Sequence, residues 1–416
     1  MQKYEKFHLK DEQTVSSAVS AWTGVAGIFG LLAALIVVYI VRPGYTVAWL
    51  ILMGSAAVPM LFAEYYRNRH WKSLVIAPGI FTYQQILGWK IRGLLFAGLI
   101  WVVTLTVFQF ANMAVTATLL EFLPWLGPVL LVYLLFYLIK VRSEDWEPGT
   151  LLSLGYALDQ QGYRWGVWKD TARNHLIKAF FLPLMIDASY LWLVMFYHDL
   201  ERGFQIAWYF VPMALLYLID TVYATIGYMC NSHRLDTHIR SSNPYLLAWV
   251  AALVCYPPLM FLRENAGLML YTQNGSGTGG APWMVWFERG SLLFYSWGTV
   301  IVALTVIYAW ATVIFGIRFS NLTNRGIITN GPYRYFKHPA YLAKNLSWWF
   351  LYVPFLSMAS GWHTLQMVGA LLVTNMIYWC RAKTEEWHLM QDPQYQAYSK
   401  WIARNGLFAR VKKLFQ

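Results

Sequence analysis

The chain has 416 residues, of which 58% are hydrophobic and only 12% are charged. A soluble globular protein carries about 25% charged residues, so this composition excludes a soluble domain and indicates an integral membrane protein. The net charge of +12 does not require a nucleic-acid partner, because basic residues beside apolar runs anchor a protein to anionic lipid. The three cysteines lie in apolar surroundings, without the spacing of a metal site or a disulfide framework.

Apolar runs recur along the whole chain and predict an all-α, polytopic membrane protein with about ten transmembrane helices. A span of this kind needs roughly 17–25 apolar residues, and most of the runs have this length. The predicted spans are 17–41, 44–64, 93–119, 122–139, 179–199, 204–230, 246–262, 291–316, 345–358 and 362–380.

The connections between these runs predict the orientation of the chain. With the N-terminus inside, the inner connections carry 28 of the Lys and Arg residues and the outer ones carry 4. Because basic connections stay on the cytoplasmic side, we expect both termini there. Without targeting features, a bacterial inner membrane is the expected location.

The first 285 residues are expected to form an N-terminal bundle of about seven spans with no assigned role. Three acids fall in or at the ends of its apolar runs, namely Glu64, Asp187 and Asp220. Intramembrane acids are functional candidates, although we expect a neighbouring Tyr, Arg or backbone group near a helix end to satisfy each of them. The pair Pro257–Pro258 should kink or break the seventh span.

Residues 286–416 form a second predicted unit, which contains two polar motifs. The first, Gly326–Tyr341, reads GIITNGPYRYFKHPAY, and the second, Arg381–Glu386, reads RAKTEE. Between them lie two short apolar runs separated by a break at Ser357–His363. A helical hairpin returns the chain to the side on which it started, so we expect the two motifs to meet on one face of the membrane.

The two motifs together resemble the C-terminal signature of the isoprenylcysteine carboxyl methyltransferase and phospholipid methyltransferase families. The resemblance covers about residues 315–405. It implies a membrane enzyme that uses S-adenosylmethionine (SAM) to methylate a membrane-embedded, lipid-like or prenylated substrate. Membrane lipids are then the expected partners, and the sequence leaves the oligomeric state unknown.

The first motif offers a site for the carboxylate of the cofactor. His338 precedes a proline, so its backbone is disfavoured in the helical region, and Pro339 suits the first position of a helix. Free N–H groups at such a helix start bind anions, and Arg334 lies nearby. Tyr341 falls one turn into the helix and can line the same pocket. An ordinary capped helix start with basic neighbours would look similar.

The second motif places Arg381 and Glu385 four residues apart, so they share one helix face, whereas Glu386 points elsewhere. The resemblance implies cofactor and substrate roles at these positions. We expect Glu386 to bind the cofactor ammonium, Arg381 to act on the acceptor and Glu385 to orient Arg381. The opposing interpretation is a surface salt bridge. No set of His, Cys, Asp and Glu has the spacing of metal ligands, so no metal is expected.

Two other functions remain open on the sequence. An NADPH-dependent reductase of the sterol-reductase type also has about ten spans, and a non-catalytic membrane protein could retain the same fold. Binding of SAM, of NADPH or of neither would distinguish the three.

Overall fold

Helices make up nearly all the regular structure of the computed structural model, which describes residues 16–70, 72, 81–159, 165–274 and 281–414. A bilayer offers no water to backbone N–H and C=O groups, so apolar segments satisfy these groups within helices. The helices are α1 (Ala21–Val41), α2 (Tyr45–Arg67), α3 (Tyr83–Phe110), α4 (Val115–Ile139), α5 (Leu151–Asp159), α6 (Trp165–Leu200), α7 (Phe204–Met229), α8 (Leu246–Leu253), α9 (Leu259–Asn265), α10 (Leu292–Phe315), α11 (Pro339–Tyr352), α12 (Gly361–Leu389), α13 (Pro393–Asn405) and α14 (Leu407–Leu414).

Several of these helices begin at a hydroxyl side chain that caps the first turn. Ser20, Thr82, Ser291 and Ser360 each accept a hydrogen bond from a backbone N–H two or three residues further on. Such caps satisfy donors that have no partner inside the helix. The helix starts are therefore fixed by local sequence, before any packing between helices.

Seven helices of the described chain are long and apolar enough to cross a membrane, which confirms an all-α polytopic membrane protein. These candidate spans are Ala21–Val41, Tyr45–Arg67, Tyr83–Phe110, Val115–Ile139, Lys169–Leu200, Ile206–Met229 and Leu292–Arg318.

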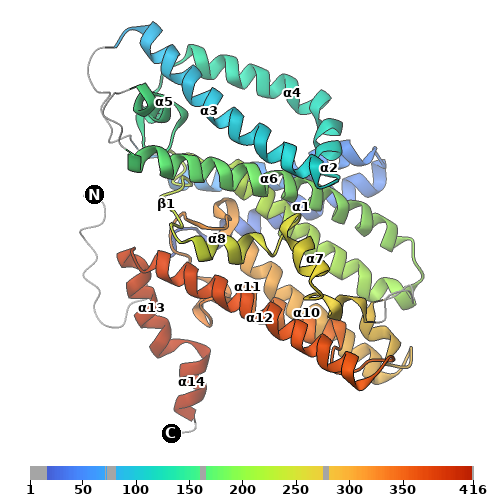
Figure 1. Cartoon of the computed structure of the whole chain (residues 1–416). Coiled ribbons are helices and arrows are strands. Elements are labelled where there is room, and N and C mark those ends of the chain that lie inside the picture. The colour runs from blue at the N-terminus through green and yellow to red at the C-terminus, as the bar shows by residue number, and fades with distance from the viewer. Residues whose placement is uncertain (1–15, 71, 73–80, 160–164, 275–280, 415–416) are drawn as a thin grey trace.

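The three other predicted spans take different forms. The run 246–262 is divided into α8 and α9, because Pro257 and Pro258 lie between them and proline lacks the N–H that continues a helix. The run 345–358 falls in α11, which has 14 residues, and the run 362–380 falls in α12, which has 29 residues and continues to Leu389. Helices α11 and α12 run in opposite directions, as the hairpin prediction requires (Figure 1).

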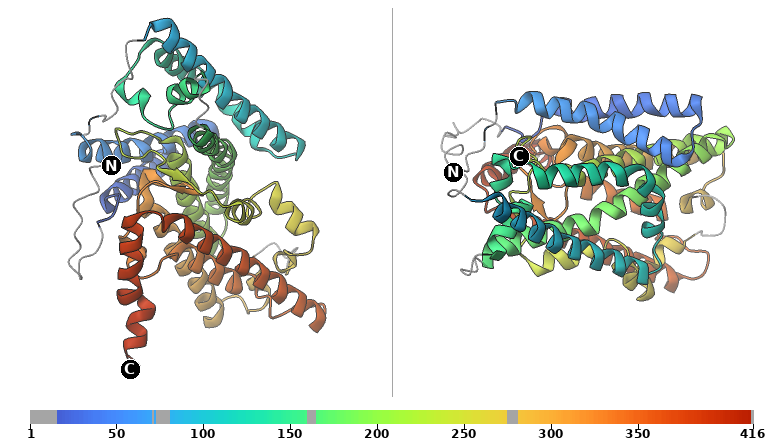
Figure 2. Two further views of the ribbon diagram at one scale, coloured as in Figure 1. Left: turned by 60° about the vertical axis from the view of Figure 1, so that its left-hand side comes forward. Right: turned by 90° about the horizontal axis from the view of Figure 1, so that it is seen from above.

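The largest apolar core joins α1, α2, α6, α7 and α10. Its fully buried members include Leu31, Leu52, Leu193, Leu218 and Ile317. Helices α3 and α4 lie along one flank of this core (Figure 2). Many apolar side chains of α4 are exposed, as expected for a surface that contacts lipid acyl chains.

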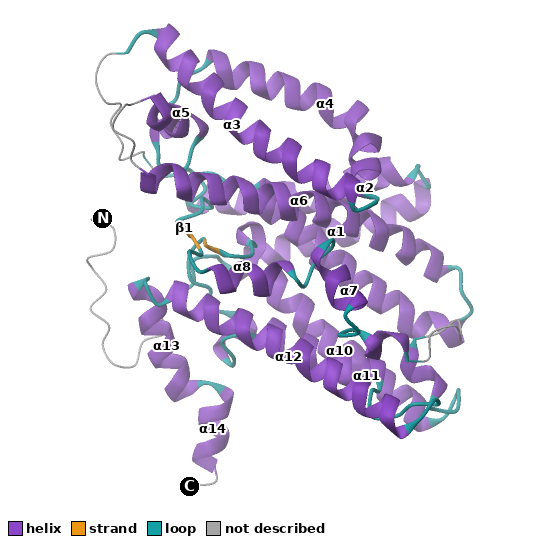
Figure 3. Ribbon diagram, in the orientation of Figure 1, coloured by secondary structure: helices purple, strands orange, loops and turns teal. Residues whose placement is uncertain are grey.

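One end of the bundle carries most of the basic connections. Helix α13, the strands β1 (Ser241–Ser242) and β2 (Thr323–Asn324), and α5 lie there together (Figure 1). The two strands pair antiparallel, with Ser241 opposite Asn324 (Figure 3). We call this end the basic end.

Two of the intramembrane acids are hydrogen-bonded to hydroxyls of neighbouring helices. Asp187 accepts a hydrogen bond of 2.5 Å from the Thr118 hydroxyl. Asp220 accepts bonds from the Tyr308 hydroxyl at 2.6 Å and the Thr312 hydroxyl at 2.5 Å. These contacts join α4 to α6 and α7 to α10, so they support the structural explanation for both acids.

A buried ionic cluster joins the N-terminal bundle to the segment after α10. Glu64 is fully buried and lies 3.5 Å from Arg318, which also lies 3.4 Å from Asp236. Arg325 is buried beside this cluster and donates from all three guanidinium nitrogens to backbone carbonyls, among them those of Gly227 at 2.6 Å and Thr237. These arginines therefore fix the loop after α10 against the loop after α7.

Candidate functional site

The hairpin of α11 and α12 brings the two polar motifs into direct contact. The His338 Nε2 atom lies 3.2 Å from a carboxylate oxygen of Glu386. The Tyr341 hydroxyl donates a hydrogen bond of 3.1 Å to Glu385. Residues more than forty positions apart in the sequence thus form one polar cluster at the basic end of the bundle.

Local backbone geometry presents the first motif. His338 is the N-cap residue of α11, with φ −129° and ψ 63°, outside the helical region, and the buried Pro339 is the first residue of the helix. Gly331 has a φ of +56°, and a Cβ atom at this position would lie 2.7 Å from the side chain of Ile314. Only glycine fits this turn easily, so the position of the motif depends on it.

Arg381 is the buried charge at the centre of the site. Only 6% of this residue is exposed. Its guanidinium lies over three aromatic rings at 5.0–5.7 Å, those of Tyr378, Tyr341 and Tyr256. Such ring faces stabilise a cation without neutralising it. The Arg381 charge therefore remains available to an anionic or oxygen-bearing ligand.

Asn321 holds Arg381 in place and connects it to the N-terminal bundle. The side-chain carbonyl oxygen of Asn321 accepts a hydrogen bond of 3.2 Å from the Arg381 guanidinium. Its amide donates to the Tyr256 hydroxyl at 3.2 Å, and its backbone N–H donates to the Tyr228 hydroxyl at 2.9 Å. Two tyrosines from outside the C-terminal motifs thus position the central arginine.

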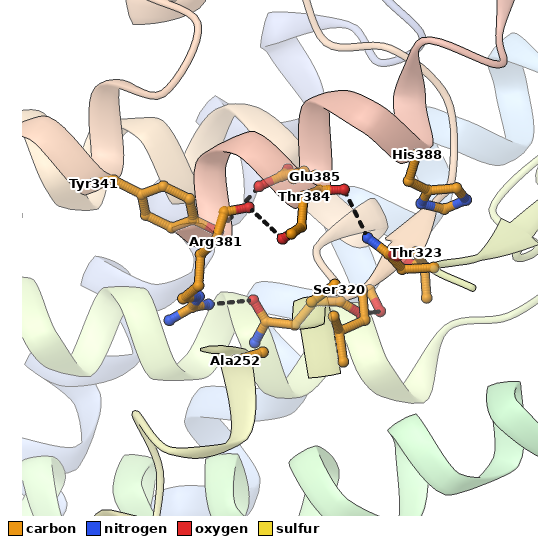
Figure 4. A pocket seen from close by; sticks show the side chains of 12 residues that line it. Ala252, Ser320, Thr323, Tyr341, Arg381, Thr384, Glu385 and His388 are labelled. Carbon is orange, nitrogen blue, oxygen red and sulfur yellow. Dashed lines mark hydrogen bonds between the residues drawn. The ribbon is translucent and has the colours of Figure 1, made fainter. Parts of the chain in front are cut away.

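Arg381 separates two cavities that share Tyr341, Asn321 and Glu385. One cavity is polar and opens beside α8, where Ala252 and Thr384 line it (Figure 4). The other lies between α10, α11 and α12, and seven Tyr or Phe side chains line it together with Lys344, so we call it the aromatic chamber. The site therefore has two chambers, which suits two different ligands.

Lys344 brings a second cation to the aromatic chamber. Its ammonium lies over the rings of Tyr308 at 5.1 Å and Trp348 at 5.6 Å. No carboxylate of the described residues lies within 4 Å of it. The chamber thus presents two cations, Lys344 and Arg381, above rings that shield them from lipid.

The two adjacent glutamates differ in their surroundings. Glu386 lies 3.6 Å from Lys337 and 3.4 Å from Lys383. Partial burial alone would raise the pKa of Glu386, but the hydrogen bond from His338 and the two lysine charges lower this pKa to about 2. The Glu385 side chain is 41% exposed and lines both chambers. The negative charge of Glu386 is thus already balanced by neighbouring cations, whereas Glu385 faces the two chambers.

A third cavity adjoins the two chambers and contains polar groups without partners. It is lined by His338, Glu385 and the aromatic residues Phe315 and Tyr333. The buried hydroxyls of Thr323 and Tyr395, which also line it, have no hydrogen-bond partner among the described residues. Buried hydroxyls of this kind usually have partners, so these two indicate a place for a polar ligand.

Two features of the site depart from the sequence prediction, namely the position of Arg334 and the contact between Arg381 and Glu385. Arg334 is exposed and does not line the chambers or the third cavity. Arg381 and Glu385 share a helix face, yet these two described residues do not form an ion pair; Arg381 bonds to Asn321 instead. Among the described residues, no group of three His, Cys, Asp or Glu side chains gathers at a distance that would hold a metal.

Several residues of the site carry no functional signal in the sequence. Asn321, Tyr256 and Thr323 lie outside the two polar motifs, and aromatic residues are too frequent in this chain to single one out. Tyr395 and Tyr398 follow the second motif in the sequence. Both are buried, and the Tyr398 hydroxyl donates to the carbonyl of Tyr333 at 2.7 Å.

The site thus consists of a buried arginine between two chambers, with carboxylates and the start of α11 beside it. Residues 292–391 match the model of the Isoprenylcysteine carboxyl methyltransferase (ICMT) family. The match covers both polar motifs and confirms their resemblance to this family. The comparisons with curated proteins and with solved structures gave no match.

Proposed function

We propose that this chain is a SAM-dependent methyltransferase that acts on a membrane-embedded or lipid-like substrate at the cytoplasmic face. One observation carries the proposal: Arg381 and Glu385, from the segment that matches the family, line the same two chambers as Tyr341. The division into residues 1–285 as an accessory bundle and 286–416 as the methyltransferase module is part of this proposal.

The donor set of the site fits the polar groups of SAM. The cofactor carries an ammonium, a carboxylate, a ribose and an adenine. Glu385 would hold the ammonium, and the N–H groups at the start of α11 beside His338 would hold the carboxylate. The unpartnered hydroxyls of Thr323 and Tyr395 suit the ribose, and the nearby rings of Phe315 and Tyr333 suit the adenine.

The contacts favour Glu385 over Glu386 for the cofactor ammonium. Helix spacing alone favours Glu386, because it leaves Glu385 on the face of Arg381. However, Lys337, Lys383 and His338 already neutralise Glu386, so a further cation would gain little there. Among the described residues, Glu385 accepts a hydrogen bond from the Tyr341 hydroxyl, lies 3.8 Å from His338 and is open to the cavities.

SAM, when bound, supplies a methyl group on a sulfonium together with the leaving group. The tasks left to the chain are to bind, to orient and to exclude water. Arg381 would bind the acceptor through its guanidinium, which Asn321 holds in one orientation. The aromatic rings around it keep water from the reacting groups.

The aromatic chamber supports a lipid-like or prenylated acceptor with a polar head. Its rings suit an apolar chain, and its two cations suit an anionic or oxygen-bearing head group. The chamber lies beside α10 and α11, whose outer faces carry exposed apolar side chains such as Val306 and Leu346.

Calorimetric titration of the purified chain with SAM tests this function. We expect Glu385→Ala to weaken SAM binding by at least roughly 30-fold, because truncating one member of a buried charged pair costs about 2–5 kcal/mol. Glu386→Ala is the matched control and should change the affinity much less. Arg381→Ala should leave SAM binding intact and slow methyl transfer to an isoprenylated cysteine or a phospholipid.

The outcomes separate the competing functions. Wild-type binding of NADPH without SAM would identify a reductase, and binding of neither would identify a non-catalytic protein. If Glu386→Ala abolishes SAM binding and Glu385→Ala does not, the roles of the two glutamates are exchanged. Each variant must keep the melting temperature of the wild type for this comparison.

A further inference from the structure

Helix α14 carries apolar and basic side chains on opposite faces. Leu407, Phe408 and Val411 lie on one side of the helix, and their exposed fractions are 39%, 73% and 41%. Arg410, Lys412 and Lys413 are exposed on the other side. An exposed helix of this pattern is typical of segments that lie in the interface of a membrane, with the apolar side toward the acyl chains.

The position of α14 in the fold agrees with an interfacial location. Helices α13 and α14 run crosswise to the long helices at the basic end, and α14 projects beyond the side of the bundle (Figures 1 and 2). Since the long helices cross the bilayer, a helix that lies crosswise at their end runs along the membrane surface. Its exposed apolar side chains therefore lie at the level where head groups meet acyl chains.

Charge complementarity identifies the lipid that this helix would contact. The last 24 residues from Pro393 carry five Lys or Arg residues and no Asp or Glu. Basic residues within a Debye length of an anionic leaflet are attracted to it, whereas a zwitterionic surface offers no net attraction. The fit is thus to anionic phospholipid, and not to neutral lipid.

Helix α14 is attached to the first motif of the candidate site. The Leu407 N–H donates to the carbonyl of Tyr335 at 3.0 Å, and the Arg410 guanidinium lies 5.7 Å from the centre of the Tyr335 ring. The Phe408 and Phe336 rings pack with centroids 5.6 Å apart. Phe336 lies two residues before His338, so α14 touches the same loop that presents His338 to Glu386.

We propose that α14 binds the surface of a bilayer that contains anionic phospholipid. Its apolar side enters the interface, and Arg410, Lys412 and Lys413 bind lipid phosphates. This contact holds the loop before His338 at the membrane surface. The inference does not depend on methyltransferase activity, because it concerns a lipid contact of the folded chain alone.

Hydrogen exchange of the full chain in nanodiscs tests the proposal. The probes are discs of phosphatidylcholine alone and discs that also contain phosphatidylglycerol. We expect the amides of residues 407–414 to exchange more slowly in the anionic discs, by roughly tenfold or more. High salt should remove most of this difference, because it screens exposed charges.

The triple variant Arg410→Gln, Lys412→Gln, Lys413→Gln should abolish the dependence on lipid charge. A matched control is the triple variant Arg69→Gln, Lys72→Gln, Lys140→Gln, which removes three charges from other connections near the spans and should retain the dependence. Exchange in α12 reports whether each variant is folded.

Equal exchange of residues 407–414 in the two kinds of disc, with wild-type chain, would overturn the proposal. Retention of the lipid dependence in the α14 triple variant would overturn it as well. Protection that depends on the number of chains per disc, and not on lipid charge, would instead assign this face to contact with a second copy.

Discussion

Two buried arginines, Arg381 at the centre of the candidate site and Arg325 beside it, have opposite surroundings. Arg325 donates from every guanidinium nitrogen to backbone carbonyls, and its own burial lowers its pKa to about 10. Arg381 is equally buried, but its one hydrogen bond among the described side chains goes to Asn321, and tyrosine rings cover the rest of it. Arg325 belongs to the loop after α10 and lines the third cavity, whereas Arg381 lies between the two chambers.

The difference between the two arginines separates a structural charge from a charge available for function. A buried charge is costly unless hydrogen bonds satisfy it. At Arg325 the fold itself supplies those bonds, so the residue fixes two loops against each other. At Arg381 the fold supplies ring faces and one amide, so the remaining donors are left for a ligand.

The largest effect is expected from replacing Arg325. Arg325→Leu leaves several buried carbonyls without donors, at about 1–3 kcal/mol for each unsatisfied group, so the protein should lose well over 3 kcal/mol of stability. Arg381→Leu should cost only about 1–2 kcal/mol, since it loses cation–π contacts and one hydrogen bond. Thermal unfolding in detergent measures both. Equal destabilisation by the two substitutions would mean that Arg381 is a structural charge in the same sense as Arg325.

An intermediate effect is expected from the contact between the N-terminal bundle and Arg381. Tyr256→Phe keeps the ring under the guanidinium but removes the hydroxyl that accepts from Asn321. The loss of one hydrogen bond of about 0.5–1.5 kcal/mol should lower kcat/KM by roughly 2–12-fold. SAM affinity should remain unchanged. Tyr228→Phe is a suitable comparison, because its hydroxyl accepts from the Asn321 backbone and not from the side chain. An unchanged kcat/KM for Tyr256→Phe would mean that Asn321 is positioned by the loop alone.

The smallest effect is expected from replacing Glu386, which makes the stability of the protein depend on pH. The pKa of Glu386 is lowered to about 2, so its contribution is complete above the ordinary glutamate pKa of 4.5 and is lost as the pH falls toward 2. Glu386→Gln should therefore flatten the fall of the melting temperature between about pH 5 and pH 3. Glu385→Gln should leave that slope as it is. If the Glu386→Gln variant kept the wild-type slope, the contacts of ionised Glu386 with His338 and the lysines would not contribute to the pH dependence of stability.

The sequence predicts the parts of this molecule that depend on local patterns. Apolar runs predict the helices, and the length of the segment from Asn345 to Cys380 predicts the hairpin that joins His338 to Glu386. The break at Pro257 also follows from local chemistry. In contrast, Asn321 and Tyr256 become part of the site only through packing between segments that are distant in the sequence. No short pattern marks such a residue, because its position depends on the whole bundle.

With α12 crossing the bilayer, as the apolar run 362–380 predicts, this helix would set the height of the site relative to the membrane. At about 1.5 Å per residue, its 29 residues extend about 43 Å, whereas the hydrocarbon layer is about 30 Å thick. Arg381 lies twenty residues after the start of α12, at about the full thickness of that layer. Hydrophobic mismatch would therefore act directly on the site: a thicker bilayer draws Arg381 among acyl chains, and a thinner one exposes it to water. We expect methyl transfer to show an optimum in acyl-chain length, which links the composition of the host membrane to turnover.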